Sequence, residues 1–339
     1  MKAWRLHEKE KLSLDELPAQ SVGDGCVKLK TLASGISLTD TAMYTGKLPL
    51  ESSPLIIGRQ CVGMVTETGE GVSGLVRGDR VAADPCVCCK TCPPCKANRA
   101  DECEKMICYG VNDNGFLSDF TVASANALYK LPERITDGDA LFIEHIALSI
   151  NAVSKLNLEK GEHIVIVGAD ALGIILAQVA LYYQAVPILV DTDGESLALA
   201  ENLGVYYTVN SVDADPMKKI FAITGGKMAD CVAFVTTSRM AFGRSLEYAS
   251  VGGRVALAGW TEVTEEFSGS FSAILDKKLK VVGVNNGAKL FPAAINLLAT
   301  RTVDVSKLVS REVKFDDVEN FIKEQADNAD GFILAAVKA

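Results

Sequence analysis

The strongest constraint on the fold of this chain is an alternation of short aliphatic runs with helical stretches between residues 161 and 284. This alternation predicts repeated strand–helix–strand units whose strands lie parallel in one sheet. Because helices cover both faces of such a sheet, its strands read as continuous apolar runs. The expected strands are residues 163–167, 186–190, 230–235, 254–258 and 279–284. The region therefore predicts an α/β domain with a doubly wound parallel sheet.

One stretch of this region, residues 171–190, is apolar enough to be compared with a membrane span. Its polar side chains are Gln178, Tyr182, Tyr183 and Gln184, it contains Pro187, and a glycine loop precedes it. A helix followed by a buried parallel strand accounts for this pattern better than a bilayer does. We expect no membrane association.

The segments on either side of the alternating region predict a second domain. Residues 1–147 are rich in glycine and β-branched residues, with period-two patches at 26–30 and 63–67, which is typical of an antiparallel β domain. Residues 285–339 supply a helix near 291–299 and a last strand near 332–337, too little for a core of their own. The expected organisation is a β domain (1–147), a parallel-sheet domain (148–284) and a return to the first domain (285–339).

The balance of charge argues against nucleic acid as a partner. The chain has 43 acidic and 34 basic residues, a formal net charge of -9, and no run of lysine or arginine. Its first residues lack an apolar region of signal-peptide length and continue into charged, strand-like sequence, so a cytoplasmic location is expected. A small-molecule substrate is the better expectation.

Ten cysteines in a chain without a secretory signal favour metal or redox chemistry over a disulfide framework. Cys89, Cys92, Cys95 and Cys103 follow the spacing Cys-x2-Cys-x2-Cys-x7-Cys within a lobe at residues 86–103. Four thiolates at such spacing can close a tetrahedron around zinc with no open position. The motif therefore predicts one structural zinc ion per chain.

Two alternatives to structural zinc are an iron–sulfur cluster and unligated thiols. Cys86 extends the spacing backwards and Cys88 offers another register. An iron–sulfur run counted from Cys86 requires a cysteine and then a proline where this chain has Lys96 and Ala97. The remaining cysteines lie in apolar surroundings and are interpreted as small buried side chains: Cys26, Cys61, Cys108 and Cys231.

A glycine loop between the first parallel strand and its helix is typical of a dinucleotide-binding site. The loop consists of Gly168, Ala169, Asp170, Ala171, Leu172 and Gly173. Asp170 stands where such loops have their middle glycine, and its charge could weaken binding beside two phosphates. Alternatively, Asp170 turns outward or caps the helix while its amide still serves the phosphate.

An acidic residue at the end of the second parallel strand bears on the choice of nucleotide. Asp191 lies where a carboxylate would accept hydrogen bonds from the adenosine ribose hydroxyls, which favours NAD over NADP. Asp193 adds a negative charge near the place of a 2′-phosphate. The alternative interpretation is that Asp191 caps the following helix.

Five further motifs accompany the four-cysteine lobe: Gly58-x4-Gly63-x-Val65, Gly69-x-Gly71-Val72, Gly78-Asp79-Arg80-Val81, Gly115-Phe116 with Phe120, and Lys130-Leu131-Pro132. With these motifs, the sequence resembles over essentially its full length the medium-chain dehydrogenase/reductase family, the group of zinc alcohol, sorbitol and threonine dehydrogenases. This resemblance implies a GroES-like β domain, a Rossmann NAD-binding domain, and a C-terminal return to the first domain.

Family members that use catalytic zinc carry a cysteine followed by a hydroxyl residue and Asp, a Gly-His-Glu triplet, and a third ligand beyond the β domain. The matching positions here hold Ser37, Thr39 and Asp40, then Arg59 and Gln60, and of the family's usual Glu-Pro-Leu segment only Glu144 remains. A serine hydroxyl is a poor zinc ligand, and arginine does not lose its proton to become one. No catalytic zinc is expected.

The resemblance suggests roles for the substituted positions. Arg59 could stabilise negative charge on a substrate oxygen, and Thr39 occupies the proton-relay position. Alternatively, Arg59 forms an internal ion pair with Asp40 or Glu144 and does not touch substrate. His145 stands where the family has proline and could act as an acid or base, or be held by Glu144 for structural reasons.

Three functions follow from these residues. The leading hypothesis is an NAD(H)-dependent oxidoreductase that acts without catalytic zinc on a carbonyl, a conjugated alkene or an iminium-like small molecule. The alternatives are a non-catalytic or regulatory relative that keeps the fold and the structural zinc, and a conventional zinc-dependent alcohol dehydrogenase. By analogy with the family, the sheet edge at 279–284 implies a homodimer or homotetramer.

Overall fold

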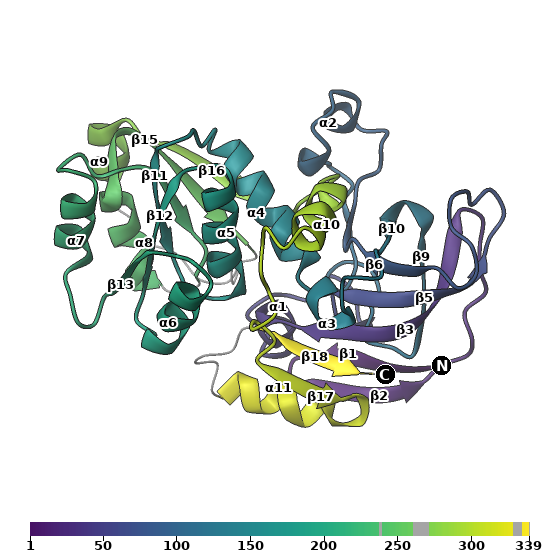
Figure 1. The fold of residues 1–339 in the computed structure, drawn as a ribbon. Coiled ribbons are helices and arrows are strands. Elements are labelled where there is room, and N and C mark those ends of the chain that lie inside the picture. Colours follow the sequence, from purple (N-terminus) through teal and green to yellow (C-terminus); the bar gives the residue numbers. More distant parts are fainter. Residues whose placement is uncertain (237–238, 260–270, 328–333, 339) are drawn as a thin grey trace. The chain divides into compact units, whose positions relative to one another are not determined.

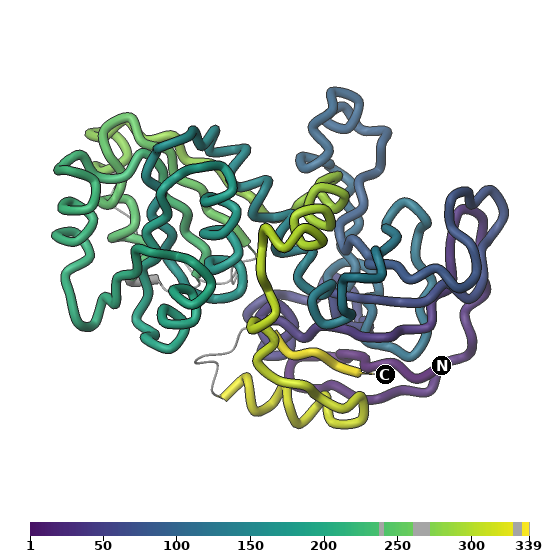
Figure 2. The backbone as a smooth tube through the Cα atoms, viewed as in Figure 1, coloured from purple at the N-terminus to yellow at the C-terminus, as the bar shows by residue number. Residues whose placement is uncertain are grey.

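The computed structural model describes residues 1–236, 239–259, 271–327 and 334–338 (Figures 1 and 2). The chain forms two compact units. The first comprises Met1–Glu144, Phe291–Ala299 and Leu308–Ala339, and the second comprises His145–Leu290 and Thr300–Lys307.

The tail differs from the expected single return to the first domain, because residues 285–290 and 300–307 belong to the second unit. Hydrogen bonds explain the difference. Gln178 donates to the carbonyl of Asp304 at 3.0 Å and accepts from its amide at 2.7 Å, and Asn151 donates to the carbonyl of Asn286 at 2.7 Å. These bonds hold both short segments against helices of the second unit.

The second unit is built on a six-stranded sheet in the order β13-β12-β11-β14-β15-β16, and every neighbouring pair is parallel. Its strands are β11 (His163–Val167), β12 (Val186–Asp191), β13 (Tyr207–Asn210), β14 (Ala229–Phe234), β15 (Ala249–Ala258) and β16 (Lys280–Val284). The predicted parallel sheet is confirmed. The sequence pattern did not predict β13, a four-residue edge strand with only one fully buried side chain.

Helices accompany these strands along the chain. They are α4 (Ile143–Lys155), α5 (Ala171–Tyr182), α6 (Gly194–Asn202), α7 (Pro216–Ile223), α8 (Arg239–Ser245), the short η3 (Leu246–Tyr248) and α9 (Phe271–Lys277). Helix α5 is buried over most of its length, as predicted for a helix that feeds the buried strand β12. No helix among the described residues is both long enough and apolar enough to cross a membrane.

The first unit is mostly antiparallel, as predicted. Its larger sheet has the order β10-β6-β5-β3-β18-β17 with β9 paired to β3, its smaller sheet has the order β2-β1-β4, and β7 pairs with β8. The strands are β1 (Lys2–Glu8), β2 (Lys11–Glu16), β3 (Cys26–Ile36), β4 (Leu55–Ile56), β5 (Cys61–Thr68), β6 (Arg80–Ala83), β7 (Cys86–Val87), β8 (Ile107–Cys108), β9 (Phe120–Ser124), β10 (Leu128–Lys130), β17 (Arg311–Lys314) and β18 (Ala335–Lys338). The one parallel pair among them is β17 with β18.

The helices of the first unit are short. They are α1 (Leu38–Tyr44), α2 (Pro93–Lys96), η1 (Ala100–Glu102), η2 (Ala125–Ala127), α3 (Asp137–Ala140), α10 (Phe291–Ala299), η4 (Phe315–Asp317) and α11 (Val318–Asp327). Helix α10 confirms the helix predicted there, and its Phe291 stacks on Tyr129 with ring centroids 5.3 Å apart. The predicted last strand is β18, which pairs antiparallel with β3; positions 332 and 333 of that prediction lie outside the described residues.

Candidate active site

A close approach of backbone segments at Gly58 comes directly before the buried Arg59. Gly58 has a φ of +93°, and an added Cβ would lie 2.9 Å from the Cβ of Leu117. A Cβ on Gly110 or Gly115 would lie 2.7 or 2.3 Å from the Gly58 carbonyl oxygen. Three segments of backbone therefore meet at a distance that only glycine permits, directly before Arg59.

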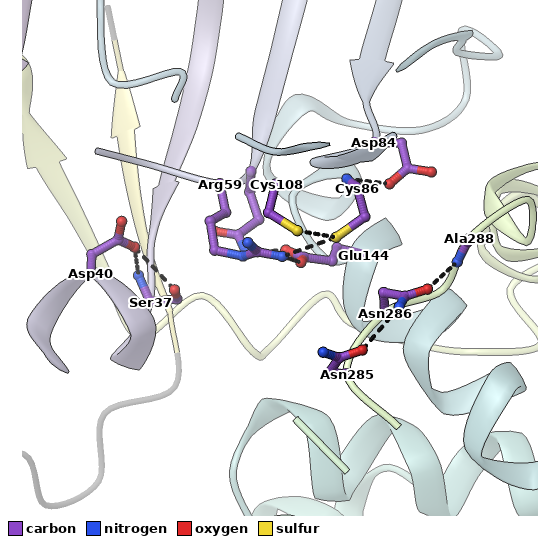
Figure 3. Close-up of polar contacts among 11 residues, drawn as sticks. Ser37, Asp40, Arg59, Asp84, Cys86, Cys108, Glu144, Asn285, Asn286 and Ala288 are labelled. Atoms are coloured by element: carbon purple, nitrogen blue, oxygen red, sulfur yellow. Dashed lines mark hydrogen bonds and ion pairs between the residues drawn. The ribbon is translucent and has the colours of Figure 1, made fainter. Parts of the chain in front are cut away.

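Arg59 is buried and forms an ion pair with Glu144 (Figure 3). One carboxylate oxygen of Glu144 accepts a hydrogen bond from Nη2 of Arg59, and the other accepts one from Nε2 of Gln60. The side chains of Arg59 and Glu144 are only 1% and 13% exposed. Burial disfavours the guanidinium charge, but Glu144, Cys86 and Cys108 together outweigh this effect and raise the pKa of Arg59 above its ordinary value. Position 59 therefore holds a charged guanidinium that is ion-paired with Glu144.

Asp40 joins helix α1 to the backbone of Gly58. One of its oxygens accepts from the amide and hydroxyl of Ser37, at 2.8 and 3.0 Å, and the other accepts from the amide of Gly58 at 2.9 Å. Burial raises the pKa of Asp40, although these hydrogen bonds favour its charged form. Of the two partners considered for Arg59, Glu144 is the one in ion-pair contact. Thr39 lies half-buried in the first turn of α1.

Three residues that the sequence did not predict for this site lie near Arg59: Cys86, Cys108 and Asp84. The Sγ of Cys86 is 3.6 Å from Nη2 of Arg59 and 3.8 Å from the Sγ of Cys108 (Figure 3). Asp84 is buried and accepts a hydrogen bond from the amide of Cys86 at 2.9 Å. Burial raises the pKa of Asp84 well above its ordinary value. Cys108 is buried as expected, but it contacts a second thiol. Only the register of β7 and β8 reveals this contact, because the two cysteines are distant in sequence.

The four cysteines of the lobe converge as predicted. The sulfur atoms of Cys89, Cys92, Cys95 and Cys103 all lie within 4.8 Å of one another, and in the described part of the chain no other group of three or more such ligands does so. The amides of Thr91 and Cys92 donate to the Sγ of Cys89, at 3.5 and 3.3 Å. Bonds from the hydroxyl and amide of Thr91 lower the pKa of Cys89 to about 5.

This donor set fits a closed structural zinc site, in which amide hydrogen bonds support the thiolates. Cys86 lies outside the four-sulfur group and contacts Cys108, so the alternative register that begins at Cys86 is not assembled.

The glycine loop of the second unit forms a tight strand-to-helix turn. Gly168 has a φ of +117°, and a Cβ on Gly173 would lie 1.9 Å from the Gly168 carbonyl oxygen. Asp170 is the N-cap of α5, and its Oδ1 accepts from the amide of Gly173 at 2.9 Å. Burial, with a contribution from Asp191, raises the pKa of Asp170 to about 6. Asp170 therefore caps the helix, one of the two alternatives considered for it.

Asp191 joins the end of β12 to the glycine loop. Its Oδ2 accepts from the amide of Ala169 at 2.6 Å, and its Oδ1 accepts from the amides of Thr192 and Asp193 at 2.6 and 3.0 Å. The N-cap of α6 is Asp193, which accepts from the amide of Glu195 at 3.0 Å. Asp191 therefore does not cap the following helix, and its role toward a ribose stays a prediction.

His145 follows Glu144 in the first turn of α4 and is half-buried. It belongs to the second unit, whereas Glu144, Arg59 and Gln60 belong to the first. The carboxylate of Glu144 uses its two oxygens for Arg59 and Gln60. An acid or base role for His145 stays a prediction.

An antiparallel β unit with a four-cysteine lobe and a parallel-sheet unit with a glycine loop together define an alcohol dehydrogenase architecture. Two family models match the corresponding regions: the alcohol dehydrogenase GroES-like domain at residues 23–133 and the zinc-binding dehydrogenase at residues 171–300. An uncharacterised zinc-type alcohol dehydrogenase-like protein of Haemophilus influenzae is 33% identical over 98% of this chain and 97% of its own length. The chain thus belongs to the medium-chain, zinc-type alcohol dehydrogenase family of oxidoreductases, with a GroES-like domain and a Rossmann-type domain.

Other relatives show how widely the family ranges. The starvation-sensing protein RspB of Escherichia coli K12 is 27% identical over 91% of this chain and 89% of its own. A crystal structure described as a short chain alcohol dehydrogenase, rspB, from E. coli CFT073 in complex with NADH superposes with a TM-score of 0.90. It is 24% identical and covers 100% of this chain and 99% of its own, so this likeness concerns the fold.

Removal of the guanidinium from Arg59 should destabilise the first unit strongly. In R59A the carboxylate of Glu144 would stay mostly buried without its counter-charge, and loss of one partner of a buried pair costs about 3–5 kcal/mol. Urea unfolding measures the change. The matched control is R311A, because the Arg311–Glu324 pair is 54% and 57% exposed and such pairs contribute at most about 1 kcal/mol.

Replacement of both partners in R59M/E144M should recover most of the lost stability, since neither charge remains buried. Equal losses in R59A and R311A would show that the pair does not stabilise the fold.

Proposed function

We propose that this protein is an NAD(H)-dependent oxidoreductase that acts without catalytic zinc on a small molecule carrying a carbonyl, a conjugated alkene or an iminium-like group. The observation that carries the proposal is the buried Arg59–Glu144 pair. By resemblance, Arg59, Gln60 and Ser37 stand where relatives have catalytic zinc ligands. A guanidinium and an amide nitrogen that both donate to Glu144 do not form a zinc donor set.

Hydride transfer to a carbonyl places negative charge on oxygen, and a fixed cation stabilises that charge without a metal. A bound nicotinamide supplies the hydride. In the proposed mechanism Arg59 stabilises the developing oxyanion, and Glu144 and Gln60 hold the guanidinium in place. Thr39 passes a proton to the oxygen, while Ser37 and Asp40 hold the first turn of α1 that carries it. His145 is the proposed second acid or base.

NAD is the proposed nucleotide because of two carboxylates that follow β12. Asp191 is positioned by the amides of Ala169 and Thr192, and Asp193 lies at the start of α6. A 2′-phosphate near these carboxylates would meet like charge, whereas ribose hydroxyls could donate to Asp191. The glycine loop then receives the pyrophosphate at the N-terminus of α5, through Gly168, Ala169, Asp170, Ala171, Leu172 and Gly173.

A second candidate is a non-catalytic relative that keeps the fold and the structural zinc. The observation that favours it is the carboxylate of Asp170, which takes the amide of Gly173 where a phosphate would bind. Binding of the nucleotide separates the two candidates.

Titration of the protein with NADH and NADPH tests the proposed function. NADH should bind about tenfold more tightly or better, since each like charge beside a phosphate opposes NADPH by roughly 1 kcal/mol even at the dielectric constant of water. D191A should weaken NADH binding and narrow the ratio of the two dissociation constants. D213A, which removes an exposed carboxylate elsewhere in the second unit, is the control. Failure of both nucleotides to bind below millimolar concentration would contradict the proposal and favour the non-catalytic candidate.

The same titration with acid-stable NAD+ at pH 7.5 and 5.5 examines Asp170. Its pKa is raised to about 6, so its carboxyl is charged at the higher pH and mostly neutral at the lower one. Removal of a negative charge beside the pyrophosphate should strengthen binding about threefold to fivefold as the pH falls. D170N should lose this dependence. Identical profiles in both proteins would show that Asp170 does not face the phosphates.

Metal analysis tests the proposed zinc content. We expect one zinc ion per chain, held by Cys89, Cys92, Cys95 and Cys103. C95S should lose it, whereas C88S removes a lobe cysteine outside the four-sulfur group and should keep it. Two zinc ions per chain in the wild type would overturn the assignment of Arg59 and favour a conventional zinc-dependent alcohol dehydrogenase.

We also propose that the protein works in the cytoplasm as a homodimer or homotetramer. None of the ten cysteines forms a disulfide in the structure, as expected in a reducing compartment. Strand β16 lies at one edge of the parallel sheet, and its Val281 is 40% exposed, which suits pairing with a second copy across a two-fold axis. Sedimentation equilibrium should give a mass of at least twice the 36.1 kDa of one chain, and a monomer would contradict the proposal.

A further inference from the structure

Cys86 and Cys108 lie directly opposite each other in the register of β7 and β8. Both of their amides bond to side chains: that of Cys86 to Asp84 at 2.9 Å, and that of Cys108 to Asn112 at 2.7 Å. The next rung of the ladder is a hydrogen bond from the amide of Tyr109 to the carbonyl of Pro85 at 2.8 Å. The two cysteines therefore form a non-hydrogen-bonded pair, the closer type, with Cα atoms typically about 4.5 Å apart.

This geometry suits a disulfide. Disulfides join residues whose Cα atoms are roughly 4.4–6.8 Å apart, with an S–S bond of about 2.05 Å. The sulfurs of Cys86 and Cys108 are already 3.8 Å apart (Figure 3), so small side-chain rotations bring them to bonding distance. The backbone of β7 and β8 can stay in place.

The surroundings favour thiolate chemistry over metal binding at this pair. Nη2 of Arg59 lies 3.6 Å from the Sγ of Cys86, and a guanidinium attracts a thiolate but repels a metal cation. The contact with Cys86 lowers the pKa of Cys108, and the charge of Arg59 acts in the same direction against the effect of burial. Within the described residues, the one potential metal cluster does not include either sulfur.

We propose that Cys86 and Cys108 form a redox-active dithiol that a small peroxide oxidises reversibly to a disulfide. The residues are 4% and 6% exposed, which favours a small oxidant such as hydrogen peroxide over a protein oxidant. Neither sulfur belongs to the four-sulfur group of Cys89, Cys92, Cys95 and Cys103.

The reaction balances with the peroxide as oxidant. The thiolate of Cys108 attacks one peroxide oxygen, the O–O bond breaks, and hydroxide leaves and takes a proton to become water. The resulting sulfenic acid is attacked by the thiol of Cys86; the S–S bond forms, the S–O bond breaks, and a second water leaves. Two electrons pass from the two sulfurs to the peroxide, and a dithiol reductant returns them.

Oxidation also changes the environment of Arg59. A disulfide carries neither the thiolate charge nor the thiol proton, so the guanidinium loses a potential counter-charge and keeps Glu144. The redox state of the dithiol thereby acts on the electrostatics of the Arg59–Glu144 pair.

Peptide mapping of the zinc-loaded full chain tests the proposal. After treatment with hydrogen peroxide and alkylation of the remaining thiols, trypsin should release residues 81–90 joined to residues 106–130, whose single cysteine is Cys108. Dithiothreitol should abolish the link, and the zinc content should not change. C86S should lose the link and stop at a Cys108 sulfenic acid that dimedone traps. C88S removes a neighbouring cysteine of the same peptide and should keep the link.

Two outcomes would overturn the proposal. One is the absence of the link in the folded wild type under conditions in which the urea-unfolded chain forms it. The other is a link that persists in C86S, because it would then run through Cys88 or Cys89. Both readouts are independent of nucleotide binding, so they stand or fall separately from the proposed oxidoreductase activity.

Discussion

A buried arginine in the first unit needs a counter-charge, and the local structure meets this need. An unpaired guanidinium at 1% exposure would lose its hydration without compensation. Glu144, in the first turn of α4, supplies the opposite charge, and the second oxygen of this carboxylate accepts a hydrogen bond from Gln60. The glycines at 58, 110 and 115 let three backbone segments converge so that Arg59 can reach this carboxylate. The ion pair and the close packing of backbone at Gly58 therefore depend on each other.

The neighbouring charge also distinguishes the two groups of cysteines in the first unit. In the lobe, four sulfurs converge, and those of Cys89 and Cys103 accept backbone hydrogen bonds, an arrangement that favours thiolates around a divalent cation. Beside Arg59, two sulfurs face a fixed cation, which leaves thiolate and disulfide chemistry as their options. Cysteines of the two groups thus suit different chemistry, metal binding in the lobe and disulfide formation beside Arg59, because the charge next to them differs.

In the second unit, two backbone amides of the glycine loop donate hydrogen bonds to carboxylates of the protein itself. Asp170 accepts a hydrogen bond from the amide of Gly173, and Asp191 accepts one from the amide of Ala169. The burial that raises the pKa of Asp170 also makes its charge costly, which couples this loop to pH in a range near neutrality. A glycine at position 170 would leave the amide of Gly173 to an incoming phosphate, so the substitution bears directly on nucleotide binding.

The sequence by itself determined the parallel sheet, the antiparallel β unit and the four-cysteine lobe, because each follows from local pattern: aliphatic runs, period-two alternation and close ligand spacing. It also showed that the positions of catalytic zinc ligands in the resembling family hold Ser37, Arg59 and Gln60. The tertiary structure decided which carboxylate pairs with Arg59, since Asp40 and Glu144 were equally compatible with the residue pattern. It alone brought Cys86 to Cys108 and returned residues 300–307 to the second unit. Such contacts join residues far apart along the chain, and they depend on strand register and side-chain direction, which spacing in sequence does not encode.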